Sequence, residues 1–141
     1  MPTIFTRIID GELPGSFVWR DDRAVGFMSI NPLAPGHVLV VPTLEVDHWI
    51  DLDTDLAGHL FDVAAVIGRA QMAAFACLRV GLIVAGYEVP HCHVHVIPTT
   101  SMRQLDFANA ATGIEPAALD AAAEAIRAQL RSAGRVEVPT P

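Results

Sequence analysis

The sequence has few aromatic residues, few cysteines and little positive charge. Aromatic side chains make up only 6% of the 141 residues and hydrophobic residues 52%, so the core must consist of Ala, Val, Leu and Ile. Sixteen acidic and nine basic residues give a formal net charge of -7. Such a chain lacks the basic surface that binds nucleic-acid backbones, so we expect no nucleic-acid partner. A local pocket for a small nucleotide is still compatible with this charge.

Two further absences concern paired cysteines and long apolar runs. Cys77 and Cys92 are the only cysteines and no C-x-x-C pair occurs, so we expect two buried free thiols and no zinc site built on cysteine. No stretch of about 18 apolar residues is present, and residues 1–7 lack the layout of a signal peptide. We therefore expect no membrane span and a cytoplasmic location.

The length suits one domain, which we expect to span residues 1–141. Apolar residues at helical spacing predict a long helix over 51–77, and Pro116 favours the start of a second helix over 116–131. Short apolar runs between turn residues predict five strands, at 16–20, 24–29, 37–41, 79–85 and 89–97. Because most of these strands follow one another directly, we predict an α+β fold with a mostly antiparallel sheet.

The remaining segments are predicted to connect or flank these elements. We expect a short helix or turn over 3–10 and a tight connection at 86–88. We also expect a loop over 101–112 with apolar anchors that include Leu105 and Phe107. The tail 134–141 carries two prolines and is expected to fray or to pack late.

The segment His91-Cys92-His93-Val94-His95-Val96-Ile97-Pro98 holds half of the six histidines. Strict alternation is typical of a strand, because successive side chains point to opposite faces. The three histidines should therefore line one face of the sheet, and Cys92, Val94 and Val96 should point into the core. Three imidazoles so close together predict a nucleophilic, proton-transfer or metal site.

Two chemical interpretations are open from the residues themselves. One imidazole can act as a nucleophile while its neighbours move protons. Alternatively, two or three imidazoles can bind zinc, with His37 as a further ligand and Glu88 nearby as carboxylate support. His37 follows Gly36, which permits close backbone approach. His48 and His59 are interpreted as surface or boundary residues.

The motif His91-x-His93-x-His95, followed by two apolar residues, resembles the signature of the histidine triad (HIT) superfamily. Further segments carry the same resemblance: Thr3-Ile4-Phe5, Ile8, Gly11-Glu12, Pro14, Asp21-Asp22, Phe27, the run from Asn31 to Pro42, and Ala85-Gly86. The resemblance covers residues 3–100 and is nearest to the Hint-like nucleotide hydrolase branch. It implies a HIT-like fold in which residues 101–141 form a C-terminal helical extension.

The resemblance implies a hydrolase or transferase that cleaves at the α-phosphate of a nucleoside monophosphate derivative. Phosphoramidates, acyl- or sulfo-adenylates and dinucleoside polyphosphates are the candidate substrates. His93 would attack the phosphorus to form a covalent nucleotidyl-histidine, which water then hydrolyses. His95 would contact the phosphate and help to protonate the leaving group, while His91 and His37 would orient the site. The implied chemistry uses no metal and no other cofactor.

A pocket for a purine nucleotide is also implied by the resemblance. The candidate nucleotide-binding residues are Ile4, Phe5, Ile8, Phe27, Met28, Ser29, Ile30, Tyr87, Glu88 and Val89. Three of them depart from the family pattern. Ser29 replaces an acidic residue that grips the ribose, Tyr87 replaces a glutamine, and Glu88 replaces a serine. A carboxylate at position 88 would repel a phosphate unless it were protonated or turned away.

Three hypotheses for the function follow. The first is a HIT-family nucleotide hydrolase, and relatives in the Hint branch imply a homodimer, for which the long helix and the fourth strand offer apolar surfaces. The second is a nucleotide-binding HIT protein with little or no catalytic activity, which the departures at 29, 87 and 88 favour. The third is a histidine-bound zinc protein, which leaves the N-terminal resemblance unexplained.

Overall fold

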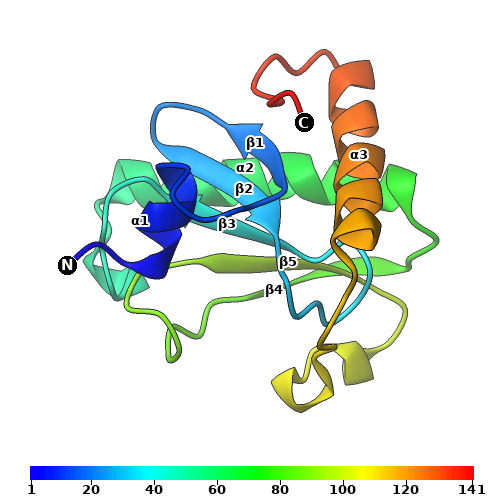
Figure 1. Cartoon of the computed structure of the whole chain (residues 1–141), viewed down its shortest axis with the longest axis horizontal. Coiled ribbons are helices and arrows are strands. Elements are labelled where there is room, and N and C mark those ends of the chain that lie inside the picture. Colours follow the sequence, from blue (N-terminus) through cyan, green and yellow to red (C-terminus); the bar gives the residue numbers. More distant parts are fainter.

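Five antiparallel strands form one sheet in the order β1-β2-β3-β5-β4 (Figure 1). The computed structural model describes residues 1–141, with strands β1 (Phe17–Arg20), β2 (Ala24–Met28), β3 (Val38–Pro42), β4 (Arg79–Ile83) and β5 (Val94–Thr99). The helices are α1 (Ile4–Ile9), α2 (Thr54–Ala74) and α3 (Pro116–Ser132), with short 3-10 helices at Trp49–Asp51, Met102–Gln104 and Phe107–Asn109. The predicted α+β fold is confirmed. None of the helices is both long and apolar enough to cross a membrane.

Different elements cover the two faces of the sheet. Helices α2 and α3 cover one face, where Val40 and Val96 join the main core. Helix α1 covers the other face through Phe5, which packs with Phe27 and Leu39. In Figure 1, α2 runs behind the sheet while α1 lies in front of it. This division follows from strand alternation, which sends neighbouring side chains to opposite faces.

The turn between β1 and β2 is built around one carboxylate. The Oδ1 atom of Asp21 accepts hydrogen bonds from the amides of Arg23 and Ala24, each at 2.8 Å. Its Oδ2 atom accepts from the Trp19 indole at 2.7 Å and lies 2.7 Å from Nε2 of His59. His59 therefore has a structural task at this boundary, since it ties α2 to the β1–β2 turn.

The predicted long helix is shorter than expected at both ends. Asp53 caps α2, because its side chain accepts a hydrogen bond from the amide of Leu56 at 2.8 Å. The residues before it form a separate 3-10 turn, and Phe75 leaves the helix in an extended conformation with φ -125° and ψ 150°.

The fifth strand begins at Val94 and not at residue 89, so the predicted range 89–97 is wrong at its start. The ladder with β3 begins at the pair Val40–Val94. The pairing does not continue past this pair, because β3 ends at Pro42, which has no N–H to donate. The amide of Cys92 donates to the carbonyl of Val46 at 2.7 Å and not to β3. The tight connection predicted at 86–88 is part of a longer irregular link from 84 to 93.

The C-terminal part of the chain packs more closely than predicted. Within 134–141, the carbonyl of Glu137 accepts a hydrogen bond from the amide of Arg20 at 2.8 Å, and Val138 packs against the main core. The tail is therefore laid along β1. In the loop 101–112, Leu105 is an anchor as predicted, because it packs against Leu33 and Ile97.

Candidate active site

His91, His93 and His95 lie along one face of the sheet, beneath α1. The ring centroids of His93 and His95 are 4.9 Å apart, and Phe5 of α1 contacts His93 at 4.9 Å and His91 at 5.8 Å. Only His95 belongs to a strand, so the alignment of the three rings comes from the extended chain that leads into β5. Cys92, Val94 and Val96 are buried, as predicted.

His91 is held between a main-chain carbonyl and a threonine. Its Nε2 lies 2.7 Å from the carbonyl oxygen of Pro42, and its Nδ1 lies 2.7 Å from Oγ1 of Thr3. A carbonyl can only accept, so Nε2 carries the proton and Nδ1 accepts from the threonine hydroxyl. Thr3 also caps α1 by accepting from the amide of Thr6, so the first turn of this helix is fixed to the site.

His93 has one nitrogen bonded and one nitrogen free. Its Nδ1 lies 2.8 Å from the carbonyl oxygen of His91, so Nδ1 carries the proton and Nε2 has an available lone pair. Nε2 makes no hydrogen bond within the protein, and it is accessible to solvent. This is the arrangement that a neutral nucleophilic imidazole needs.

The tautomer of His95 is set by its hydrogen bond with His37. The amide of Leu33 donates to Nδ1 of His37 at 3.0 Å, which leaves the proton of this ring on Nε2. That nitrogen lies 2.9 Å from Nδ1 of His95 and donates to it. The proton of neutral His95 is therefore on its own Nε2, which is also free of protein partners. The site thus presents an acceptor on His93 beside a donor on His95.

The environment of the site favours uncharged imidazoles. Burial, and then the nearby His95 and His93, lower the pKa of His37 to about 3. Burial and His93 lower the pKa of His95 to about 4. Burial also lowers the pKa of His93, although the carbonyl of His91 and the charge of Glu88 act in the opposite direction. These rings are therefore neutral at pH 7.

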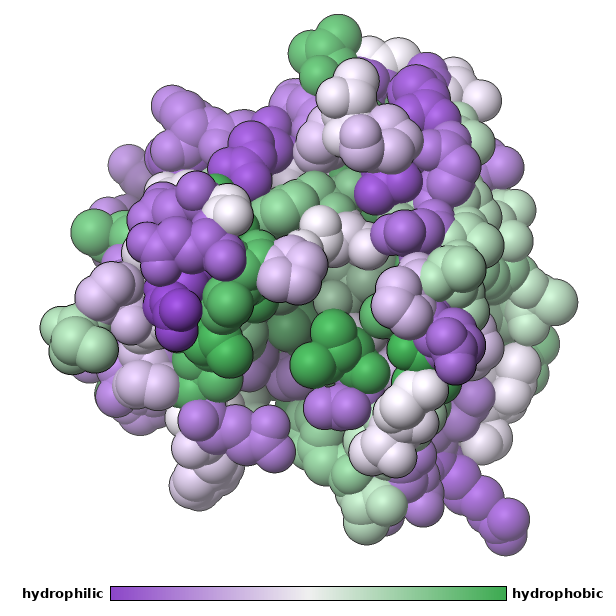
Figure 2. Space-filling model, in the orientation of Figure 1, coloured by the Kyte–Doolittle hydropathy of each residue, from purple (hydrophilic) through white to green (hydrophobic).

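Four of the predicted nucleotide-binding residues gather next to the histidines. Phe5 and Phe27 are in contact with each other at 5.6 Å and are almost fully buried, and Ile8 and Val89 pack around them. Figure 2 shows hydrophobic residues gathered in a central hollow of this face, rimmed by hydrophilic ones. Ile4, which begins α1, is half-exposed.

Two of the other candidates border the site. The amide of Ser29 donates to the carbonyl of His37 at 3.0 Å, which places the start of the 29–37 connector beside that histidine. Glu88 is exposed, and its charge reaches His93.

Three predicted nucleotide-binding residues do not line this face. Met28 is on the other side of β2, where it is buried in the main core against α2, because alternation along β2 turns it away from Phe27. Ile30 is 69% exposed and Tyr87 is 96% exposed, and neither belongs to the apolar cluster around Phe5 and Phe27. The interpretation of Met28 as a pocket residue is therefore wrong, and Tyr87 projects from the irregular link before His91.

The structure adds residues that the sequence analysis missed. Gln71 of α2 is fully buried, and its side-chain amide donates to the carbonyls of Gly36 at 2.9 Å and Val96 at 3.0 Å. It thereby clamps the residue before His37 to the residue after His95. The signal was present in the sequence, since a glutamine on the buried stripe of an apolar helix needs partners inside the protein.

Phe107, predicted only as an apolar anchor of the loop 101–112, is a second residue that lies at the site. Its ring meets the ring of His95 at 4.9 Å with an interplanar angle of 63°. Only its position in a loop with apolar anchors pointed to it.

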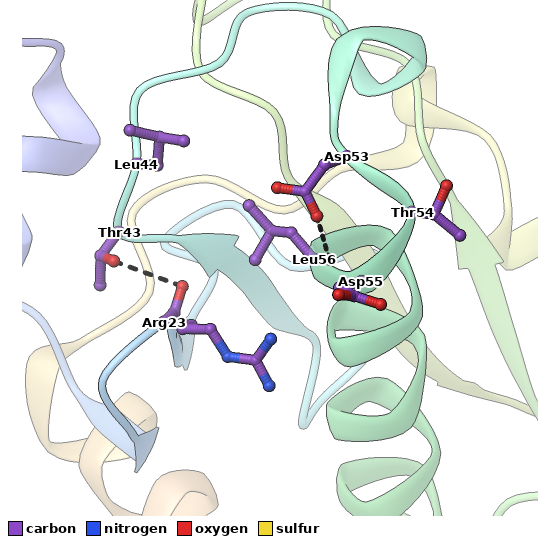
Figure 3. A pocket seen from close by; sticks show the side chains of 7 residues that line it. All are labelled: Arg23, Thr43, Leu44, Asp53, Thr54, Asp55 and Leu56. Carbon is purple, nitrogen blue, oxygen red and sulfur yellow. Dashed lines mark hydrogen bonds between the residues drawn. The ribbon is translucent and has the colours of Figure 1, made fainter.

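A separate hollow of about 550 Å³ lies at the start of α2, away from the histidines. Figure 3 shows its lining, in which Thr43 is bonded to the carbonyl of Arg23, and Asp53 caps the helix at Leu56. Two of its polar side chains, Thr43 and Asp53, thus serve the turn and the helix cap.

The imidazole nitrogens are mostly committed to the protein. Both nitrogens of His37 and both of His91 have hydrogen-bond partners, so only Nε2 of His93 and Nε2 of His95 have no partner within the protein. No group of three or more His, Cys, Asp or Glu side chains has the geometry to hold a metal ion. The arrangement therefore differs from the sets of three or four ligands that bind zinc.

A site at the start of β5, with an accepting and a donating imidazole side by side, is suited to the transfer of a group through nitrogen. The HIT domain model matches residues 10–102, which is more than half of the chain, and the chain belongs to this family. The expected membership is confirmed.

Comparison with individual proteins agrees with this family. The purine nucleoside phosphoramidase of Escherichia coli is 32% identical over 101 residues, covering 67% of this chain and 85% of that protein. A Hit-like protein of Bartonella henselae, involved in cell-cycle regulation, has a similar structure with a TM-score of 0.79 at 29% identity, covering 91% and 96% of the two chains. A HIT family hydrolase of Clostridium thermocellum is 28% identical with a TM-score of 0.61, covering 71% and 92%. The chain is thus a HIT-family protein with hydrolases among its homologues.

Proposed function

We propose that the protein hydrolyses a nucleoside monophosphate derivative at its α-phosphate through a covalent intermediate on His93. The observation that carries this proposal is the hydrogen bond from Nδ1 of His93 to the carbonyl of His91. It fixes the tautomer whose Nε2 lone pair is free, and this lone pair lies beside His95. The name of the Escherichia coli relative supports a purine nucleoside phosphoramidate as the first substrate to test.

The reaction has two displacement steps at phosphorus. In the first, the Nε2 lone pair of His93 forms a bond to phosphorus while the bond from phosphorus to the leaving group breaks. The leaving atom accepts a hydrogen bond from the N–H at Nε2 of His95 and takes up a proton from solvent, because loss of the only N–H proton of neutral His95 would leave an imidazolate. In the second, water attacks phosphorus, the bond to His93 breaks, and the proton that the water loses passes to solvent. The products are a nucleoside monophosphate and the protonated leaving group.

His37 and His91 act as positioning residues in this scheme. His37 fixes the tautomer of His95, and His91 holds the main-chain carbonyl that fixes the tautomer of His93. Phe5, Ile8, Phe27 and Val89 are proposed to form the apolar side of the nucleoside pocket, with Ile4, Ser29 and Glu88 at its border. A purine suits this pocket because aromatic side chains bind planar rings through their edges and faces.

The test is intact-protein mass spectrometry after rapid, acid-free quenching with an adenosine phosphoramidate. Wild-type protein should gain the mass of a nucleotidyl group transiently and release AMP. The variant His93→Ala should give neither, while His48→Ala, which changes an exposed histidine outside the site, should behave like the wild type. Normal turnover by His93→Ala would refute the covalent mechanism.

A second candidate function is nucleotide binding with little or no turnover. It is favoured by Glu88, whose negative charge reaches His93 and would oppose a phosphate there. Nucleotide affinity by calorimetry, without adduct or AMP across a panel of phosphoramidates, adenylates and dinucleoside polyphosphates, would establish it. The variant Glu88→Ser should then restore turnover.

We also propose that the protein is a homodimer in which β4 of one copy pairs with β4 of the other. β4 is an edge strand, and the neighbouring surface exposes Phe61 and Met72 of α2 and Leu82 of β4. An antiparallel pair of identical strands satisfies two-fold symmetry, and it covers the free edge of β4 in each copy.

The mass of the particle tests the dimer. Light scattering should give twice 15.1 kDa, and a particle of 15.1 kDa would contradict the proposal. The variant Leu82→Glu should yield monomers, whereas Val136→Glu, at another exposed site, should not.

The cytoplasm is the proposed location and one domain the proposed organisation. Both cysteines are free, as is usual in a reducing compartment. Helix α3 shares the main core with α2 through Ile126 and Leu130, so the C-terminal extension is part of the same core.

A further inference from the structure

The segment 101–112, called the wall below, lies next to the histidines and borders the site on one side. It extends past the end of the family match at residue 102. The amide of Ala111 donates to the carbonyl of Pro32 at 3.0 Å, and the side chain of Gln104 accepts from the amide of Thr100 at 2.7 Å. Leu105 is inserted among Leu33 and Ile97. The segment is therefore anchored to both the connector before His37 and the end of β5.

The residue that this wall presents to the site is Phe107. Its ring touches His95 edge to face, and the residue is nevertheless 44% exposed. The ring contacts form a row that starts at Phe5, passes through His93 and His95, and ends at Phe107. The proposed nucleoside pocket lies at the Phe5 end of this row, and Phe107 stands at the other end.

The position of the leaving group follows from the proposed reaction, on which this inference rests. The first atom of the leaving group accepts a hydrogen bond from Nε2 of His95, so it must lie within hydrogen-bond distance of that nitrogen. The ring of Phe107 contacts the ring that carries this nitrogen. A leaving group bound at His95 therefore extends beside the exposed part of Phe107.

We propose that Phe107 is a specificity-determining residue that selects substrates whose leaving group carries a planar aromatic ring. Edge-to-face or offset stacking against Phe107 would hold such a group while the bond from phosphorus to its nitrogen or oxygen breaks. The rest of the surroundings agrees with an uncharged leaving group. Leu33, Ala34 and Leu105 of the neighbouring apolar cluster lie under the wall, and the charge that reaches His93 is the negative one of Glu88. A polyphosphate leaving group would be repelled by Glu88 and would gain nothing from Phe107.

The experiment compares three adenosine 5′-phosphoramidates that differ only in the amine. The amines are 2-phenylethylamine, 2-cyclohexylethylamine and ethylamine, so planarity is separated from size. Wild-type protein should show a kcat/KM for the phenylethyl substrate about three- to tenfold above that for the other two, the range that one aromatic pair supplies. The variant Phe107→Ala should lose this preference, and Phe107→Tyr should keep it. Met102→Ala, at an exposed position of the same wall, is the matched control and should change nothing.

Each result decides a different point. Loss of the aromatic preference in Phe107→Ala alone supports the inference. Equal losses for all three substrates would mean that Phe107 only steadies His95, and the inference would be wrong. Equal kcat/KM values in the wild type would overturn it as well, while the proposed hydrolysis would stand. Absence of turnover with every substrate would overturn the proposed function, and the inference with it.

Discussion

Acidification should destabilise the fold through its buried histidines. The pKa values of His37 and His95 are lowered to about 3 and about 4 in the native state, mainly by burial, against about 6.5 in an unfolded chain. Between these values the unfolded chain binds protons that the native state does not bind. The free energy of unfolding must therefore fall as the pH falls below about 6.5.

The size of the effect follows from the lowered pKa values. One pKa unit corresponds to about 1.4 kcal/mol, so each histidine removes roughly 2.5 kcal/mol between pH 6.5 and pH 4.5. Together His37 and His95 remove about 5 kcal/mol, and the lowered pKa of His93 acts in the same direction. Since domains of this kind are stable by about 5–15 kcal/mol, acid unfolding should begin near pH 4.5.

Urea unfolding at several pH values between 7.5 and 4.5 measures this slope directly. The variant His37→Phe removes one titrating group, so its slope should be lower by up to about 1.4 kcal/mol per pH unit, whatever its stability at pH 7.5. The variant His48→Phe, at an exposed position, should keep the wild-type slope. A wild-type stability that does not fall between pH 6.5 and 4.5, or an unchanged slope in His37→Phe, would refute the reasoning.

Three further changes test how the site is held. Gln71→Leu removes the side-chain donor from two buried main-chain carbonyls and should cost about 1–3 kcal/mol in urea unfolding, with a lower kcat; an unchanged stability would show that these two hydrogen bonds do not stabilise the fold. Gly36→Ala should destabilise by about 1–3 kcal/mol, because φ is +91° and a Cβ would lie 2.4 Å from an aromatic carbon; Gly58→Ala, in open space on α2, should instead stabilise by about 0.5–1 kcal/mol. Thr3→Val should cost about 1 kcal/mol as a lost helix cap and reduce kcat through His91, and full activity would separate α1 from the site.

Much of the fold could be predicted from local patterns. Turn residues between Val-rich runs predicted the five strands, and the carboxylate of Asp21 makes the predicted turn between β1 and β2. The start of β5 could not be predicted, because it depends on which partner strand is available to pair. Alternation continues from His91 to Val96 in the sequence, but β3 ends at Pro42, and the pairing stops with it.

The residue types of the site could be predicted from the sequence, but the hydrogen bonds that connect them could not. The spacing of the histidines predicted a shared face, and the rings of His93 and His95 do lie in contact there. The partners that fix their tautomers are the amide of Leu33 and the carbonyls of Pro42 and His91, which no side-chain pattern reveals. Met28 was misplaced because a resemblance assigns a position but not the side of the strand that faces the ligand.

The use of main-chain atoms to fix the three tautomers has a consequence for mutation. Every residue type at position 42 still offers its carbonyl, and every type at position 33 except proline still offers its amide. Most single substitutions at these positions therefore leave the histidine tautomers unchanged. The residues proposed to contact the nucleoside and the leaving group act through their side chains and have no such protection, so we expect substrate range to change in single mutational steps while the tautomers of the histidines stay the same.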